Sequence, residues 1–331
     1  MKHLTNRGLV VFALAALALS SCKSKEEPDD PNRKNNEKVA TLDHLIIQEV
    51  FHSGNWHPRG YPTKDDAYIK IYNPTNKTVY LDGMALLMTP FSSNIQLELG
   101  QDCDFRETHI AGDKVIQFPG KGEEYPIEPG KVILVAHTAI DYTKDVEDGT
   151  AANPNSFDLS NANFEWLTKE QINEDDRKDN EKVPNMSVIY SGREFFDQTS
   201  PNFTISSGYG LIALVKLGVS AKDLEKDEYK WECTWNNASG GHGHGGSGTY
   251  LKIPNAWIVD AVNLCPKEAF KWYISSRTID AGWTSAMIHR PSKKKPLGLA
   301  LVRKHDGKNF VDTNNSTVDF EVVEPSLRVK K

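Results

Sequence analysis

The sequence predicts a mainly β protein, a β-sandwich or barrel interrupted by long loops and short helical insertions. Two observations support this prediction. Short runs rich in Val, Ile, Leu and Tyr recur along the chain, and turn dipeptides such as Asn73-Pro74 and Asp82-Gly83 separate them. Helical signals, in contrast, are confined to two short stretches. Short strands separated by turn residues are typical of all-β domains. With 331 residues, the chain is long enough to bury a sizeable core.

The first residues read as a secretion signal. Met1-Lys2-His3 and Arg7 carry positive charge, and residues 8–20 form an apolar run that is too short to span a bilayer. The run ends in Leu19-Ser20-Ser21-Cys22, which resembles a bacterial lipobox, where cleavage precedes a cysteine that is then acylated. We therefore expect residues 1–21 to be a lipoprotein signal peptide and Cys22 to be lipidated. The alternative is an ordinary secretory signal followed by an incidental cysteine.

Residues 22–40 are predicted to form a disordered acidic tether. The stretch is charged, contains prolines and offers almost no apolar side chain to bury. Acidic residues directly after the lipid cysteine resemble the export signal that places Bacteroidetes lipoproteins on the cell surface. We expect an outer-membrane lipoprotein at the cell surface, with the membrane as a partner through its acyl chains. A plain solvated linker is the alternative. Residues 41–331 would then form the folded domain.

Strands and helices follow from local patterns in chain order. Buried or alternating apolar runs predict strands at residues 45–51, 67–72, 78–81, 84–88, 132–136, 211–215, 256–262, 299–303 and 318–322. Capping residues and a weak apolar stripe predict a helix over residues 160–172, and a second short helix is expected at residues 266–272.

The order of these segments resembles the lamin-tail domain. "DDAYIKIYNPTNKTVYLDGMALL", "YPIEPGKVILVAHTA", "WIVDAVNL" and "LALVRKHDGKNFVDTNNSTVDFEV" follow one another as that family's segments do. In this resemblance Tyr68–Asn73 fills the family's "yIEiyN" strand, with Lys70 where an acidic residue is usual. Arg303 and residues 312–315 fill its closing "R…DTn" segment. The resemblance implies an immunoglobulin-like β-sandwich, in an uncharacterised family of Bacteroidetes lipoproteins, and it implies no chemistry.

Cysteine usage predicts one disulfide. If Cys22 is acylated, Cys103, Cys233 and Cys265 remain in an oxidising compartment, so one pair and one buried thiol are the simplest outcome. We predict the pair Cys233–Cys265, because both look like strand residues that flank the same insertion.

A glycine-rich run carries two histidines that could hold a metal. His242 and His244 lie within "GGHGHGGSG", and imidazole is a good ligand for zinc, copper or iron. A firm site needs three or four fixed ligands, and ordering the run costs about 1–2 kcal/mol per residue. A mobile loop is therefore the alternative. Calcium could also be held by Asp65 and Asp66 beside Glu49, although we favour the interpretation that the two aspartates are solvated turn residues.

A second candidate site lies in the loop after the first strand. It combines aromatic, cationic and imidazole side chains, namely those of His52, Trp56, His57, Arg59 and Tyr61. Exposed aromatic residues with arginine are typical of recognition surfaces. The same side chains could equally pack the loop onto the sandwich.

Five tryptophans in the second half raise the question of a glycan platform. They are Trp231, Trp235, Trp257, Trp272 and Trp283. Aromatic rings can stack on sugars, but most tryptophans pack a core.

Motifs of enzymes and of nucleic-acid binding are missing from the sequence. It contains no nucleophile elbow, no His-Glu-x-x-His and no Walker loop. The net charge of −6 gives no electrostatic case for nucleic acid. We therefore expect a non-enzymatic, surface-exposed, lipid-anchored binding protein. Its expected role is an accessory to nutrient or metal capture at the outer membrane, with a TonB-dependent receptor as a partner. The alternatives are an adhesive module that binds a protein or glycan, and a secreted hydrolase.

Overall fold

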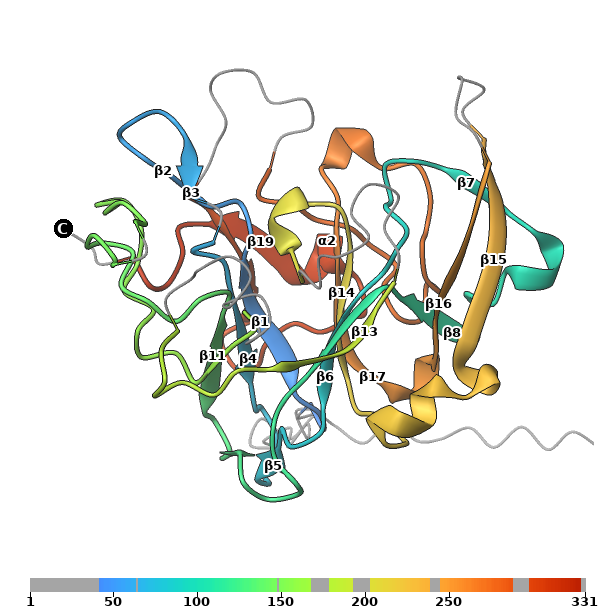
Figure 1. The fold of residues 1–331 in the computed structure, drawn as a ribbon, viewed down its shortest axis with the longest axis horizontal. Coiled ribbons are helices and arrows are strands. Elements are labelled where there is room, and N and C mark those ends of the chain that lie inside the picture. The colour runs from blue at the N-terminus through green and yellow to red at the C-terminus, as the bar shows by residue number, and fades with distance from the viewer. Residues whose placement is uncertain are drawn as a thin grey trace, which may run out of the picture. The chain divides into compact units, whose positions relative to one another are not determined.

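The computed structural model describes residues 42–63, 65–147, 149–167, 179–192, 203–238, 245–287 and 298–328. Thr41–Lys331 form one compact unit. Nineteen strands, several 3-10 turns and the short helix α2 (Ser316–Asp319) lie in the described ranges, so the mainly β prediction is confirmed (Figure 1). Cys22, His242 and His244 lie outside these ranges. Within them, no helix combines the length and apolarity that a membrane crossing would need.

Three sheets, whose strands pair almost entirely in antiparallel fashion, make up most of the unit. The first has six strands in the order β12 (Phe164–Glu165), β11 (Val132–Ala136), β4 (Tyr68–Tyr72), β1 (Ile46–Phe51), β18 (Ala300–Arg303) and β19 (Phe320–Val323). Only the pairing of β11 with β12 is parallel. A bulge in β1, between Ile47 and Glu49, shifts its register against β4.

The second sheet has five strands, in the order β13 (Ser187–Ser191), β9 (Lys114–Gln117), β6 (Ala85–Met88), β14 (Gly210–Val215) and β17 (Ile258–Leu264). Every residue of β14 is buried. A strand that is covered on both faces has a continuous apolar sequence instead of an alternating one. The run Leu211–Val215 therefore places β14 in the interior of the molecule.

The third sheet has four strands, in the order β7 (Leu97–Leu99), β15 (Lys230–Asn237), β16 (Gly246–Pro254) and β8 (His109–Gly112). Burial alternates along the first half of β15, so Trp231 and Cys233 face inward while Glu232 and Thr234 face outward. This alternation is the signature of a sheet with one covered and one open face. Two small two-stranded sheets complete the strands: the hairpin of β2 (Asn55–Trp56) with β3 (Pro62–Thr63), and the pair of β5 (Val79–Tyr80) with β10 (Pro126–Ile127), which are distant in the chain.

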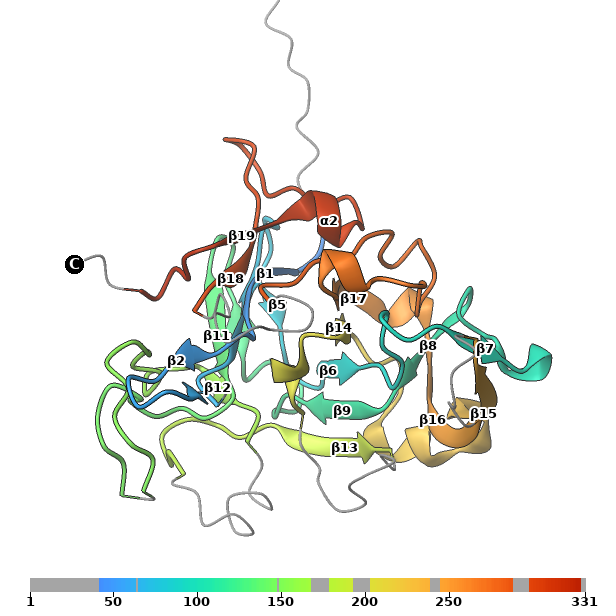
Figure 2. The same ribbon diagram turned by 90° about the horizontal axis from the view of Figure 1, so that it is seen from above.

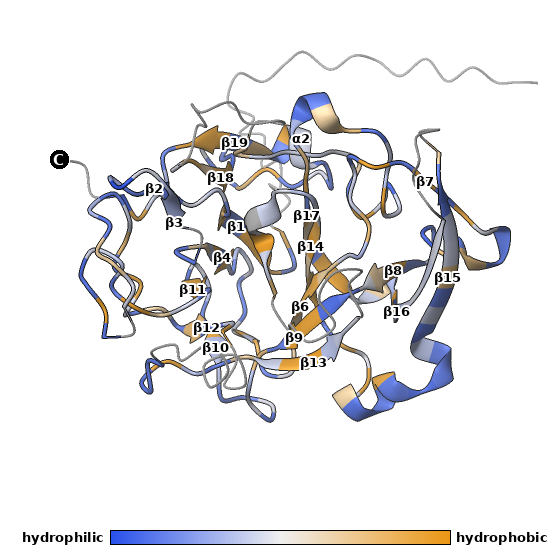
Figure 3. Ribbon diagram, turned by 45° about the horizontal axis from the view of Figure 1, so that its top comes forward, coloured by the Kyte–Doolittle hydropathy of each residue, from blue (hydrophilic) through white to orange (hydrophobic). Residues whose placement is uncertain are grey.

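The five-stranded sheet is the middle of three layers (Figures 1 and 2). One apolar core joins its first face to the six-stranded sheet and includes Val50, Ile71 and Ile212. A second core joins its other face to the four-stranded sheet and includes Ala213 and Trp231. Figure 3 shows the hydrophobic strands of the middle layer between these neighbours. The sandwich is thus extended by one more sheet.

A buried ionic cluster links the first two sheets. The guanidinium of Arg303, on β18, is 1% exposed and lies 2.6 Å from Asp260 on β17 and 3.1 Å from Asp312. Asp319 lies 3.6 Å from the same group, and the guanidinium covers the Phe320 ring. Removing a buried cation from such a cluster leaves carboxylates without compensation.

The disulfide prediction is wrong in its pairing. Cys103 is bonded to Cys233, with 5.2 Å between their Cα atoms, and Cys265 is a buried free thiol. Cys233 lies on β15, whereas Cys265 directly follows β17 in the middle sheet. The two residues therefore lie in different layers of the molecule and are not cross-strand neighbours. The expectation of one disulfide and one buried thiol agrees with this structure.

Within the described residues, the two predicted helical stretches differ from the prediction. Residues 160–167 contain β12 and no helix, and residues 168–172 lie outside the described ranges. Between residues 266 and 272 a single 3-10 turn forms over Lys267–Ala269. Residues 318–319, predicted as strand, instead end helix α2 before β19 begins.

Candidate functional site

The hairpin β2–β3 presents aromatic side chains to solvent. Trp56 and Tyr61 are each 43% exposed, and Arg59 between them is exposed as well. The turn is closed by backbone bonds from His57 N to Tyr61 O, 2.7 Å, and from Gly60 N to His57 O, 2.9 Å. Gly60 adopts a φ of +95°, a region that side chains other than glycine rarely enter. The sequence around Gly60 therefore fixes a tight turn with its aromatic residues outward.

A second loop, which includes residues 152–155, is hydrogen-bonded to this hairpin. His57 is buried, and its Nε2 atom lies 2.9 Å from the carbonyl oxygen of Ala152. Its ring stacks on Tyr61 with 4.4 Å between centroids. Asn155 Nδ2 donates to the carbonyl oxygen of Trp56 at 2.9 Å. His57 is thus an anchor, and it orients the exposed tyrosine.

Asp66 forms the base of the hairpin. Its Oδ2 atom accepts hydrogen bonds from Asn55 Nδ2 at 2.7 Å and from Ser156 Oγ at 2.6 Å. Arg328 Nη2 donates to Asn55 Oδ1 at 2.7 Å, which adds the C-terminal segment to the same network. Asp66 is fully buried, and Oδ1 has no hydrogen-bond partner among the described residues. Burial raises the pKa of this carboxyl to about 7.

His52 lies in the interior and is not part of the exposed surface. Its Nε2 atom accepts a hydrogen bond from Ala286 N at 3.2 Å, and the ring is completely buried. Burial lowers its pKa to about 4, so the ring is neutral at physiological pH. The predicted binding set therefore divides. His52 and His57 pack the loop down, whereas Trp56, Arg59 and Tyr61 face solvent.

The carboxylates considered for calcium do not converge. Glu49 accepts hydrogen bonds from Tyr68 Oη at 2.6 Å and from Ser326 N at 2.9 Å, and Lys70 Nζ lies 3.5 Å away. Asp66 has the separate set of partners given above. Within the described ranges, no group of three or more His, Cys, Asp or Glu side chains is arranged to hold a metal.

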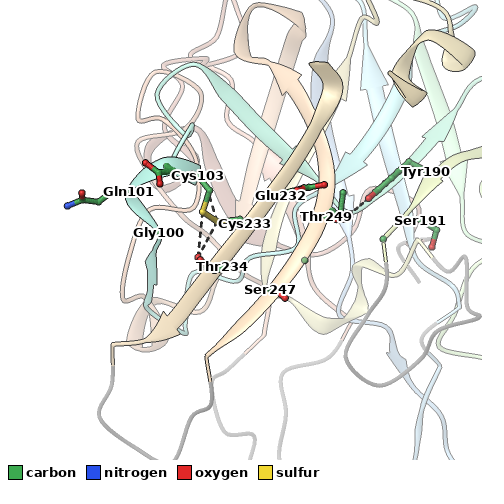
Figure 4. Close-up of a pocket in the computed structure, with 13 residues that line it drawn as sticks. Gly100, Gln101, Cys103, Tyr190, Ser191, Glu232, Cys233, Thr234, Ser247 and Thr249 are labelled. Atoms are coloured by element: carbon green, nitrogen blue, oxygen red, sulfur yellow. Dashed lines mark hydrogen bonds between the residues drawn. A yellow bond between two sulfur atoms is a disulfide. The ribbon is translucent and has the colours of Figure 1, made fainter. Parts of the chain in front are cut away.

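A trough of about 890 Å3 lies over the four-stranded sheet (Figure 4). Its floor is the outward face of β15 and β16, where Glu232 pairs with Thr249 and Thr234 pairs with Ser247. One wall is the 3-10 turn η1 (Gln101–Cys103), and the other is the end of β13 with its neighbour Gly192. The lining is dominated by hydroxyl, amide and carboxylate groups, which can donate to or accept from a polar ligand.

Both walls of the trough are tied to its floor. The disulfide Cys103–Cys233 joins η1 to β15, and Tyr190 Oη, on β13, donates to the carbonyl oxygen of Thr249 at 2.6 Å (Figure 4). Trp231 Nε1, on the inner face, donates to Cys103 O at 2.7 Å. The trough is therefore a fixed shape, because a covalent bond and two hydrogen bonds set its width.

A smaller cavity of about 570 Å3 adjoins the trough. It lies where β15 and β16 come together, and Asn236 and Gly245 are in its lining. The predicted metal residues His242 and His244 belong to the connection between these two strands, and they lie outside the described residues.

The tryptophans of the second half are mostly core residues. Trp231 and Trp272 are buried in the second apolar core. Trp235 and Trp257 pack against that core, and Trp283 stacks on Phe270 with 3.6 Å between ring centroids. The structure does not bring the five together as one platform.

Sequence reasoning missed the trough altogether. The available signal was the alternation in β15 of Trp231, Cys233 and Trp235 with Glu232 and Thr234. That pattern predicts a strand with one polar face. The walls come from segments far away in the chain, so the concave shape had no local signal.

Comparisons with known proteins agree on a family and a fold. A family model described as "Protein of unknown function (DUF4876)" matches residues 128–326. No curated protein matches the chain. A crystal structure of a DUF4876 family protein from Bacteroides thetaiotaomicron VPI-5482, at 2.50 Å resolution, is similar with a TM-score of 0.67 and 23% identity. The match covers 87% of this chain and 72% of that one, and it supports a shared fold.

Proposed function

Since this chain belongs to the DUF4876 family, whose function is unknown, we propose a function from its own geometry. The protein is a lipid-anchored surface protein that binds a partner protein through the hairpin β2–β3. It acts as an accessory to nutrient capture at the outer membrane and does not transform its ligand. The observation that carries the proposal is the exposure of Trp56 and Tyr61 on a hairpin whose conformation is fixed by hydrogen bonds to the 152–155 loop.

The energetics favour recognition as the role of this hairpin. Exposed aromatic surface costs roughly 25 cal/mol per Å2 relative to burial, so burying the two exposed rings of this hairpin in an interface would favour binding. Trp, Tyr and Arg are also the residues most enriched at the energetic centres of protein interfaces. Because hydrogen bonds already order the backbone of residues 55–62, little conformational entropy is lost on binding.

The cellular setting of the proposal comes from the sequence. The lipobox ending at Cys22 and the acidic tether support an anchor on the outer face of the outer membrane. A TonB-dependent receptor is a partner that this location would supply. The finer resemblance to lamin-tail domains belongs to the same proposal, and the ion pair between Arg303 and Asp312, two residues of its closing motif, supports it.

Capture of the partner from solubilised outer membranes of the native bacterium tests this function. The bait is the chain from residue 22 with Cys22→Ser, which removes the acylation site. We expect one receptor, identified by mass spectrometry, to be retained by this bait and lost with the W56A/Y61A double variant. Ile95→Ala is the matched control, because Ile95 is a large apolar residue that is 45% exposed elsewhere on the surface. Equal retention by all three baits would refute the proposal.

A second candidate function, glycan binding, is favoured by the trough. Its floor pairs Thr234 with Ser247 and Glu232 with Thr249, so hydroxyl and carboxylate groups face one concave surface. Asp102 and Glu232 make the lining acidic, which favours a neutral sugar over an anionic one.

Affinity gel electrophoresis in dextran, mannan and galactan tests the glycan function. A retarded band is expected in at least one of these neutral polysaccharides, and Thr234→Arg should abolish the retardation by filling the floor. Val322→Arg, an exposed strand residue of another sheet, is the control. Retardation that is unchanged in Thr234→Arg would exclude the trough as the site.

A further inference from the structure

A separate amphipathic pocket lies beside β5. Figure 1 shows β5 at the end of the unit away from the hairpin β2–β3. Its volume is about 640 Å3. Residues 42–45 form one wall, and the turn that precedes β5 forms another. Cavities of 300–1,000 Å3 with an apolar lining and a few polar groups are typical of small-molecule sites.

The base of this pocket is apolar. Met84 is 4% exposed and belongs to the first apolar core, and Val79 and Val259 pack against that core. Leu42 and Tyr80 add further apolar surface to the lining. An apolar ligand group placed here would therefore extend an existing core.

Polar networks hold both walls in place. His44 Nε2 lies 2.9 Å from Asp312 Oδ2, which joins the first wall to the buried Arg303 cluster. In the opposite wall, Asn73 Nδ2 donates to the carbonyl oxygen of Lys77 at 2.8 Å, and Thr75 Oγ1 donates to the same oxygen at 2.9 Å. The pocket is thus formed before any ligand binds.

The charges around the pocket favour an anion. The side chains of Lys77 and Lys216 are exposed in its lining, and neither forms an ion pair with a described residue. The carboxylate of Asp82 accepts hydrogen bonds from backbone N–H groups of the 122–125 segment and keeps its charge, whereas Asp43 is paired with His44. Two lysines therefore face one carboxylate without a cationic partner, and the remaining positive charge favours an anionic ligand.

We propose that this pocket binds a monomeric organic anion with an apolar body. The apolar part would cover Val79, Met84 and Val259, and a carboxylate or sulfonate head would lie between Lys77 and Lys216. An ammonium group acts as a point charge and tolerates several anionic head groups. This inference is independent of the proposed partner protein, because the hairpin contributes no residue to the pocket.

Fluorescence of 8-anilinonaphthalene-1-sulfonate, an aromatic sulfonate, tests the proposal directly. The probe should bind the soluble chain with increased emission, and decanoate below its micelle concentration should displace it. Decyltrimethylammonium has the same tail with the opposite charge, and we expect it not to displace the probe. Equal displacement by both amphiphiles would overturn the proposal.

Two variants locate the site. Val259→Trp should abolish probe binding by filling the base. The K77E/K216E double variant should weaken decanoate binding by about tenfold, which is about 1.4 kcal/mol, and as a change of exposed residues it leaves the core intact. K222E/K267E changes the same charge at two exposed lysines outside the pocket, as a control.

Unchanged decanoate affinity in K77E/K216E would overturn the proposal. Binding only to phosphatidylglycerol vesicles, with none to decanoate, would assign the lysines to a membrane surface and overturn it as well.

Discussion

Asn55 Nδ2 donates a hydrogen bond to Asp66 Oδ2 over 2.7 Å, and this bond ties the hairpin β2–β3 to the chain just before β4. Ser156 and Arg328 complete the network from two other parts of the sequence. The exposed aromatic residues are consequently carried by a base that three distant segments define. A fixed base is what distinguishes a recognition element from a loop that is exposed because nothing holds it.

Asp66 should make stability depend on pH. Its folded pKa is raised from 3.8 to about 7, so the folded state keeps the proton that the unfolded chain releases. The stabilisation is complete below pH 3.8 and is lost as pH rises through 7. We expect Asp66→Asn to gain on the order of 3 kcal/mol in free energy of unfolding relative to wild type between pH 4 and pH 8, at 1.36 kcal/mol per pKa unit. Urea unfolding at both values measures this, and an equal difference at the two pH values would contradict it.

The disulfide should contribute strongly to stability. It closes a loop of 130 residues, for which the chain-entropy model gives about 5 kcal/mol. We expect C103S/C233S to lose several kcal/mol in urea unfolding, and Cys265→Ala to keep the disulfide. Non-reducing peptide mapping of wild type should yield one linked pair, Cys103 with Cys233. A peptide linking Cys233 to Cys265 would contradict the structure.

Arg303 is expected to stabilise the sandwich strongly. Arg303→Met would leave Asp260, Asp312 and Asp319 without their buried cation, and breaking such a cluster costs roughly 3–5 kcal/mol. Thermal unfolding followed by circular dichroism measures the loss. Arg277→Met is the control, because that side chain is exposed and should change stability by less than about 1 kcal/mol. Similar melting temperatures for both variants would contradict a stabilising cluster.

Metal binding by the two histidines of the glycine-rich run remains a prediction. Because the local sequence offers two imidazoles and no carboxylate, we expect His242 and His244 to bind zinc or copper weakly. A ligand that binds only the folded form raises the melting temperature. We expect a small rise in the presence of excess zinc or copper, absent in H242A/H244A. Calorimetry that detects no heat with zinc, copper or iron at neutral pH would remove metal capture from the account.

Local patterns predicted the interior of the fold well. The continuous apolar run at residues 211–215 became β14 of the middle layer, and the alternating run at 67–72 became β4. In contrast, local patterns did not show that β15 and β16 belong to a third sheet, separate from the two sheets of the sandwich. Cys233 lies on β15, and its partner Cys103 is 130 residues away, so the disulfide could not be assigned from sequence spacing.

The candidate hairpin could be located from the sequence, but the sequence did not show which of its side chains are buried anchors and which are exposed. The histidines decide its conformation, and their partners are remote: Ala152 is 95 residues from His57, and Ala286 is 234 residues from His52. Only these long-range contacts separate anchors from exposed residues. The amphipathic pocket escaped prediction for the same reason, since Val79 and Val259 meet only in the folded core.

The central claim, that the hairpin docks on a partner protein, is tested most directly by photo-crosslinking in living cells. Benzoylphenylalanine at position 61, in the acylated chain, should yield one discrete adduct containing an outer-membrane receptor. The same residue at position 95 should yield none. Absence of an adduct from position 61, or the same adduct from both positions, would contradict the claim.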